Sequence, residues 1–474
     1  MGKSVKKNSS AKSLAIATVI FAILIISTSL GGLIDKVVIK STKIGDYKLL
    51  SESLLGLNGK KNILLLFMNN AEARTGGGFI GSVGYLAIDN GKIKSEPVRS
   101  VYYYDHKYED IGFADKFSGP YGNETFMNLR NSGLNLDANT NLKRAKSIFE
   151  LESAKPVDIV VAVTPEVLKY FLLKTGPVNL PEYNITVDYK NITDTLQTEV
   201  EYGQDKVAGK DPKTVLSSIA NILTERLSRK NISELTELGI GMKELMQQRQ
   251  IVLYSNNYEA SSFIEKARYN GGLVAFESDY FMLTENNISV DKSNAFIDRE
   301  LIRQVDIGED GCVDVGVTIK RTQFRDKSIP YVDPNNNGFT YLVKENASMI
   351  EFALPSGSKI YSERASVAIQ ARGKERGYDI YQFRSDLVPL VTSEYYFSYR
   401  LPFKVATSNF IVFNSYLQLQ NGGWPYRLSN SVTTPDGWEL SATNKRNILS
   451  SGNTVVYNED INKDVFLSLV YGKK

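Results

Sequence analysis

The spacing of apolar residues changes near residue 295, and this change limits the possible folds more than any other feature. From about residue 40 to 294, short apolar runs such as "NILLLF" and "VDIVVAV" alternate with helical stretches such as "PEVLKYFLLKT". That alternation is typical of a layered α/β domain. Farther along, apolar residues occupy every second position, as at Val313, Val315, Val317 and Ile319. A period of two predicts β-strands that bury one face.

The chain has 474 residues, which exceeds what one hydrophobic core usually organises, so more than one domain is expected. We predict an α/β domain over residues 35–294 and an all-β sandwich over residues 295–474. Turn sequences such as "PNNNG" and "LPSGS" separate the β segments, which suggests seven to nine strands. In the α/β part, Thr164-Pro165-Glu166 predicts the start of a helix, and Gly176-Pro177 predicts its end.

The N-terminal sequence predicts where in the cell the protein is located. Residues 13–34 carry no formal charge, and these 22 residues would span roughly 30 Å as a helix, the thickness of a bilayer core. The preceding residues 1–12 hold four lysines and no acid, so the positive-inside rule keeps this basic tail in the cytoplasm. We expect a single-pass signal anchor in the cell membrane and an extracytoplasmic remainder. The alternatives, a cleaved signal peptide and a buried core helix, fit the length and the flanking lysines less well.

Composition excludes several classes of function. The net charge of +3 is small and the basic residues are dispersed, so nucleic acid is not an expected partner. The single cysteine, Cys312, excludes an internal disulfide. The single histidine, His106, argues against a histidine-based zinc site or a Ser-His-Asp triad.

The stretch "NNAEARTGGGFIGSVGYLAIDNG" holds the main candidate ligand site. Its glycines match the letters of a dinucleotide fingerprint, but a strand ending at Asn90-Gly91 follows them instead of the required helix. Glycines at Gly76, Gly77 and Gly78 would let a ligand approach the backbone, and Arg74 offers a planar fork for phosphate or carboxylate. The alternative is a simple turn in which Arg74 pairs with Glu72.

Three other residues are candidates for the same site. Arg99 and Arg130 could complete a basic pocket with Arg74, although isolated arginines usually lie on solvated faces. Asp105, beside His106 at the end of the "SVYYYDH" segment, could bind Mg²⁺, although such a pair is more often part of a surface turn. No motif establishes a cofactor, and Mg²⁺ is the candidate metal.

Several motifs together resemble the bacterial domain-of-unknown-function 4012 family. They are "NILLLFMNNAEARTGGGFIGSVGYLAIDNGKI", "LRNSGLNLDA", "VDIVVAVTPEVLKYFLLKTGPV", "SNNYEASSFIEKARYNGG" and "DKSNAF". They run in this order from about residue 60 to 300. The resemblance implies no established activity.

A remoter similarity is to the LytR-CpsA-Psr family, membrane-anchored proteins that transfer glycopolymers from polyprenyl diphosphate to the cell wall. It implies an α/β ectodomain in which Arg74 matches the family's first arginine, which precedes a strand, and residues 100–105 match the end of a third strand. The chain departs from that pattern where Gly76 replaces a metal-binding aspartate and where Tyr103 or Tyr104 replaces an arginine. The family's arginine-rich segment has a lysine counterpart at Lys206, Lys210 and Lys213.

Two functional hypotheses follow. The first is an envelope protein that binds or transfers a polyprenyl-diphosphate-linked glycan or cell-wall polymer beside the membrane. The second is a non-catalytic cell-surface module for binding or structural support. We expect convergence of Arg74, Arg99, Arg130 and Asp105 to favour the first hypothesis, and scattered exposed arginines to favour the second.

Overall fold

The computed structural model describes residues 59–89, 92–105, 128–203, 214–324, 331–332, 339–340 and 345–473. Several predictions therefore lie outside the described residues: the basic tail 1–12, the membrane helix 13–34, the Asn90-Gly91 turn, His106, and the lysines Lys206, Lys210 and Lys213. Within the described ranges, every helix is too short or too polar to cross a membrane.

The first region is built on a mixed sheet in the order β3-β2-β1-β5-β8, with a short β4 beside β2. The strands are β1 (Lys61–Arg74), β2 (Gly77–Asp89), β3 (Lys92–Ser95), β4 (Arg99–Ser100), β5 (Ile159–Val163) and β8 (Ile251–Ser255). Strand β1 runs parallel to β5 and antiparallel to β2, while β8 is antiparallel to β5. The carboxyl ends of the two parallel strands therefore meet at one edge of the sheet.

Helices cover both faces of this sheet. Alternate residues of β1 point to opposite faces, so Leu64 and Leu66 pack in the cluster that includes α4, whereas Ile63 and Leu65 pack in the cluster on the other face. The helices are α3 (Tyr102–Asp105), α4 (Ala138–Ser153), α5 (Pro165–Thr175), α6 (Ile192–Tyr202), α8 (Thr214–Ser228), α9 (Ile232–Gln247) and α10 (Tyr258–Lys266). A small hairpin, β6 (Val178–Leu180) and β7 (Ile185–Val187), follows α5. The predicted mixed α/β character is confirmed.

Helix α5 has the predicted signals at its ends. The Thr164 side chain accepts a hydrogen bond from the Glu166 amide, and Pro165 is the first helical residue. Gly176 ends the helix at a φ of +87°, a conformation that glycine adopts without steric cost.

The second region is β-rich and contains two seven-stranded sheets. One sheet has the order β15-β18-β11-β10-β20-β23-β22: β15 (Lys359–Ile360), β18 (Thr392–Lys404), β11 (Cys312–Gln323), β10 (Ile297–Ile307), β20 (Tyr426–Thr433), β23 (Thr454–Ile461) and β22 (Ile448–Ser451). The other has the order β16-β17-β14-β9-β19-β24-β21: β16 (Gln370–Glu375), β17 (Tyr378–Leu387), β14 (Asn346–Pro355), β9 (Asp279–Asn287), β19 (Phe410–Gln418), β24 (Val465–Lys473) and β21 (Trp438–Thr443). A separate pair joins β12 (Tyr331–Val332) and β13 (Phe339–Thr340).

The two sheets share one hydrophobic core, in which the Phe352 and Phe397 rings stack 4.4 Å apart. The alternating residues of β11 supply Val313, Val315 and Val317 to this core. The predicted β-rich character is therefore confirmed, but the sheets hold more strands than the seven to nine expected.

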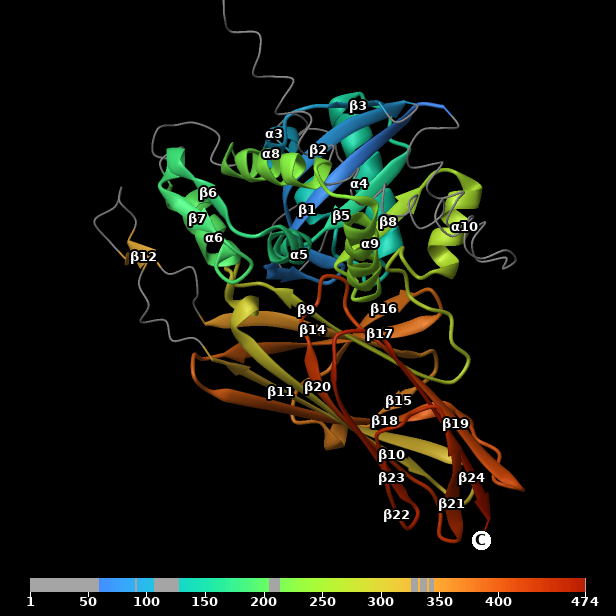
Figure 1. The fold of residues 1–474 in the computed structure, drawn as a ribbon. Coiled ribbons are helices and arrows are strands. Elements are labelled where there is room, and N and C mark those ends of the chain that lie inside the picture. Colours follow the sequence, from blue (N-terminus) through green and yellow to red (C-terminus); the bar gives the residue numbers. More distant parts are fainter. Residues whose placement is uncertain are drawn as a thin grey trace, which may run out of the picture.

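Strand β9 lies upstream of the predicted boundary at residue 295, yet it pairs with β14 and β19 inside the second region. All nine of its residues are buried. Phe281 and Leu283 face the core between the sheets, whereas Tyr280 and Met282 face the first region through Leu136 and Leu273. Burial on both faces removes the alternation of apolar and polar residues that marks a half-buried strand, which explains why the sequence did not reveal β9. Figure 1 shows the two regions stacked along this contact.

Candidate functional site

The turn between β1 and β2 lies at the contact between the two regions. A bulge in β1 places Asn69 opposite Phe79 and Ala73 opposite Gly78, so residues 70–72 have no partners in β2. Bulges of this kind redirect side chains. Here the Asn70 amide donates to the Gly422 carbonyl of the β-rich region at 3.0 Å.

Arg74 pairs with Glu72, as the simple-turn alternative predicts, but the pair is buried rather than exposed. The distance from Arg74 Nη2 to Glu72 Oε1 is 2.7 Å, and the two side chains are only 4% and 3% exposed. Arg74 Nη1 also donates to the carbonyl oxygens of Ala73 and Asn287, both at 3.1 Å. Lys292 pairs with the other oxygen of Glu72. The guanidinium fork is therefore directed largely toward the protein's own groups.

The three glycines allow the protein's own chain to approach closely. A Cβ atom on Gly76 would lie 2.0 Å from Asn141 Nδ2 and 3.0 Å from the Gly133 carbonyl oxygen. A Cβ on Gly78 would lie 2.4 Å from the backbone of Asn69. Gly77 has a φ of +149°, which also favours glycine. The motif therefore makes a tightly packed turn, and a ligand beside these three glycines stays a prediction.

Cations and aromatic rings form a continuous series that begins at this turn. The Arg74 guanidinium and the Lys292 ammonium lie 5.3 and 5.8 Å from the centre of the Phe79 ring. That ring is 6.5 Å from the Tyr102 ring, which in turn lies 5.4 Å from the Arg130 guanidinium. Such distances are within the range of cation–π attraction.

The series continues along α3. The Arg99 guanidinium lies 4.3 Å from the centre of the Tyr103 ring. Tyr102 and Tyr103 are 45% and 57% exposed, so both rings can be reached from solvent. We call this set the cation–aromatic row; it comprises Arg74, Lys292, Phe79, Tyr102, Arg130, Tyr103 and Arg99.

Asp105 fixes the position of Arg130. The carboxylate accepts hydrogen bonds from the Leu129 amide at 2.9 Å and from Arg130 Nη1 at 3.1 Å. Burial raises the pKa of Asp105, and the charge of Arg130 and the hydrogen bonds oppose that rise. Within the described residues, no group of three or more His, Cys, Asp or Glu side chains is placed to hold a metal ion. The role of Asp105 as a Mg²⁺ ligand stays a prediction.

The row has an excess of positive charge. Among the described residues, Glu72 pairs with Arg74 and Lys292, and Asp105 pairs with Arg130, so the four cations of the row and these two carboxylates carry a formal net charge of +2. Exposed rings beside guanidinium groups can stack on a flat or ring-shaped ligand while the cations attract its anionic part. Arg74 and Arg130 lie at the two ends of a chain of contacts through the Phe79 and Tyr102 rings, and Arg99 lies beside the neighbouring Tyr103.

A loop of the β-rich region, residues 419–424, covers the carboxyl ends of β1 and β5. The Trp424 indole donates to the Asn70 carbonyl at 3.1 Å, and the Gly422 amide donates to the Arg249 carbonyl at 2.7 Å. Gln420 donates to the carbonyl oxygens of Arg74 and Glu285, both at 2.8 Å. Open α/β sheets commonly bind ligands at this edge. Sequence analysis missed this loop, although its Asn421-Gly422-Gly423 triplet is a recognisable turn signal.

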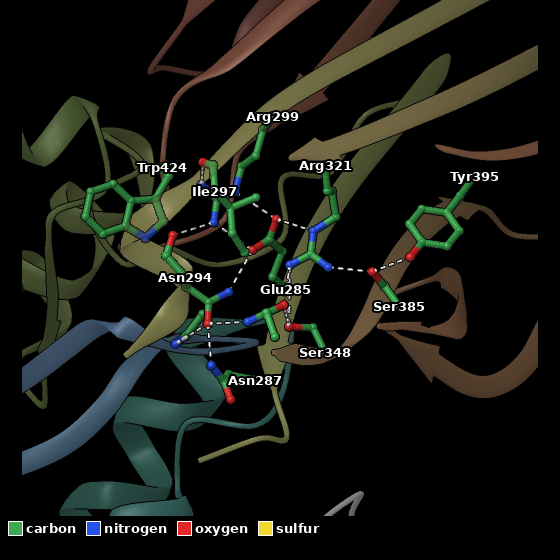
Figure 2. Close-up of polar contacts among 12 residues, drawn as sticks. Glu285, Asn287, Asn294, Ile297, Arg299, Arg321, Ser348, Ser385, Tyr395 and Trp424 are labelled. Carbon is green, nitrogen blue, oxygen red and sulfur yellow. Dashed lines mark hydrogen bonds and ion pairs between the residues drawn. The ribbon is translucent and has the colours of Figure 1, made fainter. Parts of the chain in front are cut away.

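A second group that sequence analysis missed is a buried charge network within the β-rich region, shown in Figure 2. Glu285 accepts from Arg299 Nε and Nη2, both at 2.8 Å, and from Arg321 Nε at 3.2 Å. Asn294 donates to the same carboxylate at 2.8 Å. Burial alone would raise the pKa of Glu285, but the charges of the two arginines hold it well below its usual range. No sequence motif identifies such a network, because its members come from separate strands.

Comparisons with known proteins support one resemblance. Residues 58–200 match the family described as "Protein of unknown function (DUF4012)". This match supports the family suggested by the motifs over those residues. A comparison with curated proteins finds no match.

Solved structures give only distant similarity. A yeast LTA4 hydrolase in complex with bestatin is 9% identical, with a TM-score of 0.23, over 39% of this chain and 30% of that one. The Lin1025 protein from Listeria innocua is 13% identical, with a TM-score of 0.24, over 45% and 79% of the two chains. An M1 zinc metallopeptidase from Deinococcus radiodurans is 13% identical, with a TM-score of 0.19, over 38% and 43%. The matched segments span less than half of the LTA4 hydrolase chain and of the M1 metallopeptidase chain, and similarities this weak establish neither a fold nor a function.

Proposed function

We propose that the protein is a membrane-anchored, extracytoplasmic envelope protein that binds a polyprenyl-diphosphate-linked glycan at the cation–aromatic row. The observation that carries the proposal is the position of Arg130 and Arg99 beside two solvent-exposed tyrosines, Tyr102 and Tyr103. A diphosphate needs positive charge, and a sugar ring packs well on an aromatic face. The uncharged segment 13–34 and the motif similarity to LytR-CpsA-Psr proteins support a lipid-linked ligand.

Different members of the row have different roles in this proposal. Tyr102 and Tyr103 supply the exposed rings, and Arg99 and Arg130 supply charge beside them. Arg74 is nearly fully buried, so it acts mainly by holding Glu72 in place, and Glu72 in turn holds Lys292. If the protein also transfers the glycan, Mg²⁺ near Asp105 would neutralise the diphosphate leaving group.

The second candidate is a non-catalytic surface module, and the interlocked contact between the two regions favours it. The buried Arg249 forms a bidentate ion pair with the partly buried Asp464, at 2.8 and 2.6 Å, across this contact. Arg376 pairs with Asp137 across the same contact at 2.9 Å. A contact fixed in this way suits a rigid spacer or display module.

Titration of the purified full-length protein with a short-chain polyprenyl diphosphate analogue tests the first candidate. We expect saturable binding, which Tyr102→Ala weakens by about fivefold to tenfold, the equivalent of roughly 1–1.5 kcal/mol for one aromatic contact. Repeating the titration with and without Mg²⁺ tests whether the metal contributes to binding. Tyr189→Ala is the matched control, because Tyr189 is 42% exposed and also lies beside a cation, Lys190, but outside the row. If the parent protein shows no saturable binding, or the two variants bind equally well, the second candidate replaces the first.

A further inference from the structure

One end of the β-rich region exposes large apolar side chains from three separate segments. They are Val290 in the loop after β9, Phe324 just after β11, and Val388, Leu390 and Val391 in the turn between β17 and β18. Their exposed fractions are 63%, 52%, 52%, 61% and 48%. Single exposed apolar residues are common on proteins, whereas a group gathered at one end marks an interaction surface. We call this group the apolar end.

Backbone contacts hold the three segments together. The Leu390 amide donates to the Gln323 carbonyl at 2.7 Å, which joins the turn to the end of β11. The Phe324 amide donates to the Phe296 carbonyl at 2.9 Å, and the two rings lie 6.1 Å apart. The loop after β9 reaches the same end because the amides of Ile288 and Ser289 donate to the Ala347 carbonyl, and Ala347 is paired with Asp386 of β17.

Two members of the apolar end adopt backbone conformations that their side chains disfavour. Val290 has a φ of +56° and Leu390 has a φ of +65°. Left-handed conformations are rare for branched or bulky residues, because the side chain then lies too close to the backbone. Val290 is held there by a hydrogen bond from its amide to Asn287 Oδ1 at 3.0 Å. Glycine or asparagine would fit both turns at lower cost, so the apolar side chains are not explained by turn geometry.

Side-chain hydrogen bonds join the strands that carry the apolar end. Arg321, near the end of β11, donates to Ser385 of β17 at 2.5 Å, and Ser385 donates to Tyr395 of β18 at 2.8 Å. These contacts join the strands on either side of the 388–391 turn, and Figure 2 shows them next to Glu285 and Arg299. The apolar side chains thus project from a rigid support.

We propose that the apolar end inserts into the outer surface of the lipid bilayer and so fixes how the protein stands on the membrane. The proposal rests on the membrane anchoring in the proposed function. The expected anchor, residues 13–34, is separated by 24 residues of sequence from Gly59, the first described residue, so the anchor alone does not specify how the described regions stand on the membrane. A second contact with the bilayer would restrict that orientation.

A lipid surface fits the apolar end better than a second protein copy. The exposed side chains of the three segments can enter the boundary between headgroups and acyl chains, where apolar side chains are buried about 5–10 Å deep. Five half-exposed side chains offer only a few hundred square ångström, on the order of half of the roughly 800 Å² per partner in a stable protein interface. Lys292 lies two residues from Val290 and contacts Phe79 of the cation–aromatic row. Insertion of the apolar end would therefore bring the row near the headgroups, where a lipid-linked ligand is located.

A fluorescent label at residue 390 tests the proposal in the full-length protein. A Cys312→Ser background removes the only native cysteine, and Leu390→Cys is then labelled with an environment-sensitive dye. The protein is reconstituted into vesicles of phosphatidylethanolamine and phosphatidylglycerol that contain a lipid with a nitroxide on its acyl chain. We expect blue-shifted emission that the nitroxide lipid quenches. Val388→Cys, labelled in the same way, provides a second site in case Leu390→Cys does not fold.

Leu449→Cys is the matched control, because Leu449 is 71% exposed but lies toward the opposite end of the sheet, opposite Val456 on β23. Its emission should not be quenched. Labels at 390 and 388 that are as unquenched as the label at 449 would overturn the proposal. Alkaline extraction of the same vesicles separates this result from failure of the anchor, since a protein that resists extraction without quenching at 390 is anchored but does not insert its apolar end. If extraction releases the protein, it is mixed with fresh vesicles. The quenching of the labels at 390 and 388 relative to 449 then decides whether the apolar end inserts into the bilayer.

Discussion

The Arg74 side chain is buried, and it binds several groups of the protein itself. Its guanidinium contacts Glu72, two backbone carbonyl oxygens and the face of Phe79. Lys292 shares Glu72 with it. A buried carboxylate between two cations is stable because the charges compensate the loss of hydration. Any effect of Arg74 on ligand binding therefore acts through the positions of Lys292 and Phe79.

Arg74→Lys should lower the stability of the protein even without a ligand. Lysine keeps the charge but cannot reach Glu72, Ala73 and Asn287 with a planar fork. We expect the free energy of unfolding, measured with urea, to fall by about 1.5–3 kcal/mol, the usual value for hydrogen bonds of a charged group. Arg229→Lys is the control, because its pair with Glu225 is 75% and 64% exposed, and its stability should hardly change. Equal stability of Arg74→Lys and the parent would show that the buried fork is dispensable.

At the level of elements, the β1–β2 turn and the 419–424 loop depend on each other. The turn packs its glycines against the segment around Gly133, and the Gly76 amide donates to the Gly133 carbonyl at 2.9 Å. The loop lies on the other side, where a Cβ on Gly422 would be 3.4 Å from Cα of Gly77. Segments far apart in sequence thus meet at the turn of Gly76, Gly77 and Gly78, since a Cβ atom on Gly76 or Gly78 would overlap neighbouring atoms.

The two glycines joined by that hydrogen bond should respond differently to alanine. A Cβ on Gly76 would overlap Asn141, whereas a Cβ on Gly133 would meet no atom within 4 Å. Gly76→Ala should therefore destabilise the protein by about 1–3 kcal/mol, as overpacking usually does. Gly133→Ala should be nearly neutral. Thermal unfolding measures both variants, and a similar loss in each would mean that the turn tolerates an added side chain.

At the scale of the whole molecule, buried carboxylates lie at the contact between the two regions, so the stability of this contact should depend on pH. Glu351 of β14 accepts from Thr75 of the β1–β2 turn at 2.5 Å and pairs with Arg372 at 3.2 Å. Arg372 also donates to the Leu134 carbonyl at 2.8 Å, and Glu375 accepts from the Asp137 amide at 3.0 Å. Burial raises the pKa of Glu351 and of Glu375, although Arg372 opposes the rise at both.

The sign of the expected pH dependence follows from these raised pKa values. The folded protein holds the protons of Glu351 and Glu375 more tightly than the unfolded chain does, where the pKa is near 4.5. Their contribution to stability is complete below pH 4.5 and is lost as the pH rises through the folded pKa. Glu351→Gln removes one of the two groups, so the stability of this variant relative to the parent should rise with pH above 4.5.

Urea unfolding of the parent and of Glu351→Gln from pH 4 to pH 7 measures this difference, and Glu375→Gln should show the same direction. The comparison with the parent matters because the lowered pKa of Glu285 gives the opposite dependence in both proteins. Stability curves of parent and variant that stay parallel over this range would contradict the assignment.

Local signals in the sequence correctly indicated several elements of the fold. The cap and proline at Thr164 and Pro165 predicted α5, and the period of two in β11 predicted a half-buried strand. These predictions succeed because backbone preference and hydrophobic periodicity act over a few neighbouring residues. The Glu72–Arg74 ion pair could also be predicted from the sequence, since its members are two positions apart.

The remaining features depend on contacts between distant residues. Burial on both faces hid β9 within the predicted α/β segment, and the 419–424 loop was placed over β1 and β5 by hydrogen bonds that span more than 340 positions in the sequence. The sequence by itself determined the elements with strong local signals, such as α5 and β11, and which residue types were available for binding. Only the tertiary structure decided that Arg74 would be buried and that Tyr102 and Tyr103 would be exposed. The physical reason is that burial and charge pairing depend on which surfaces the folded chain brings into contact.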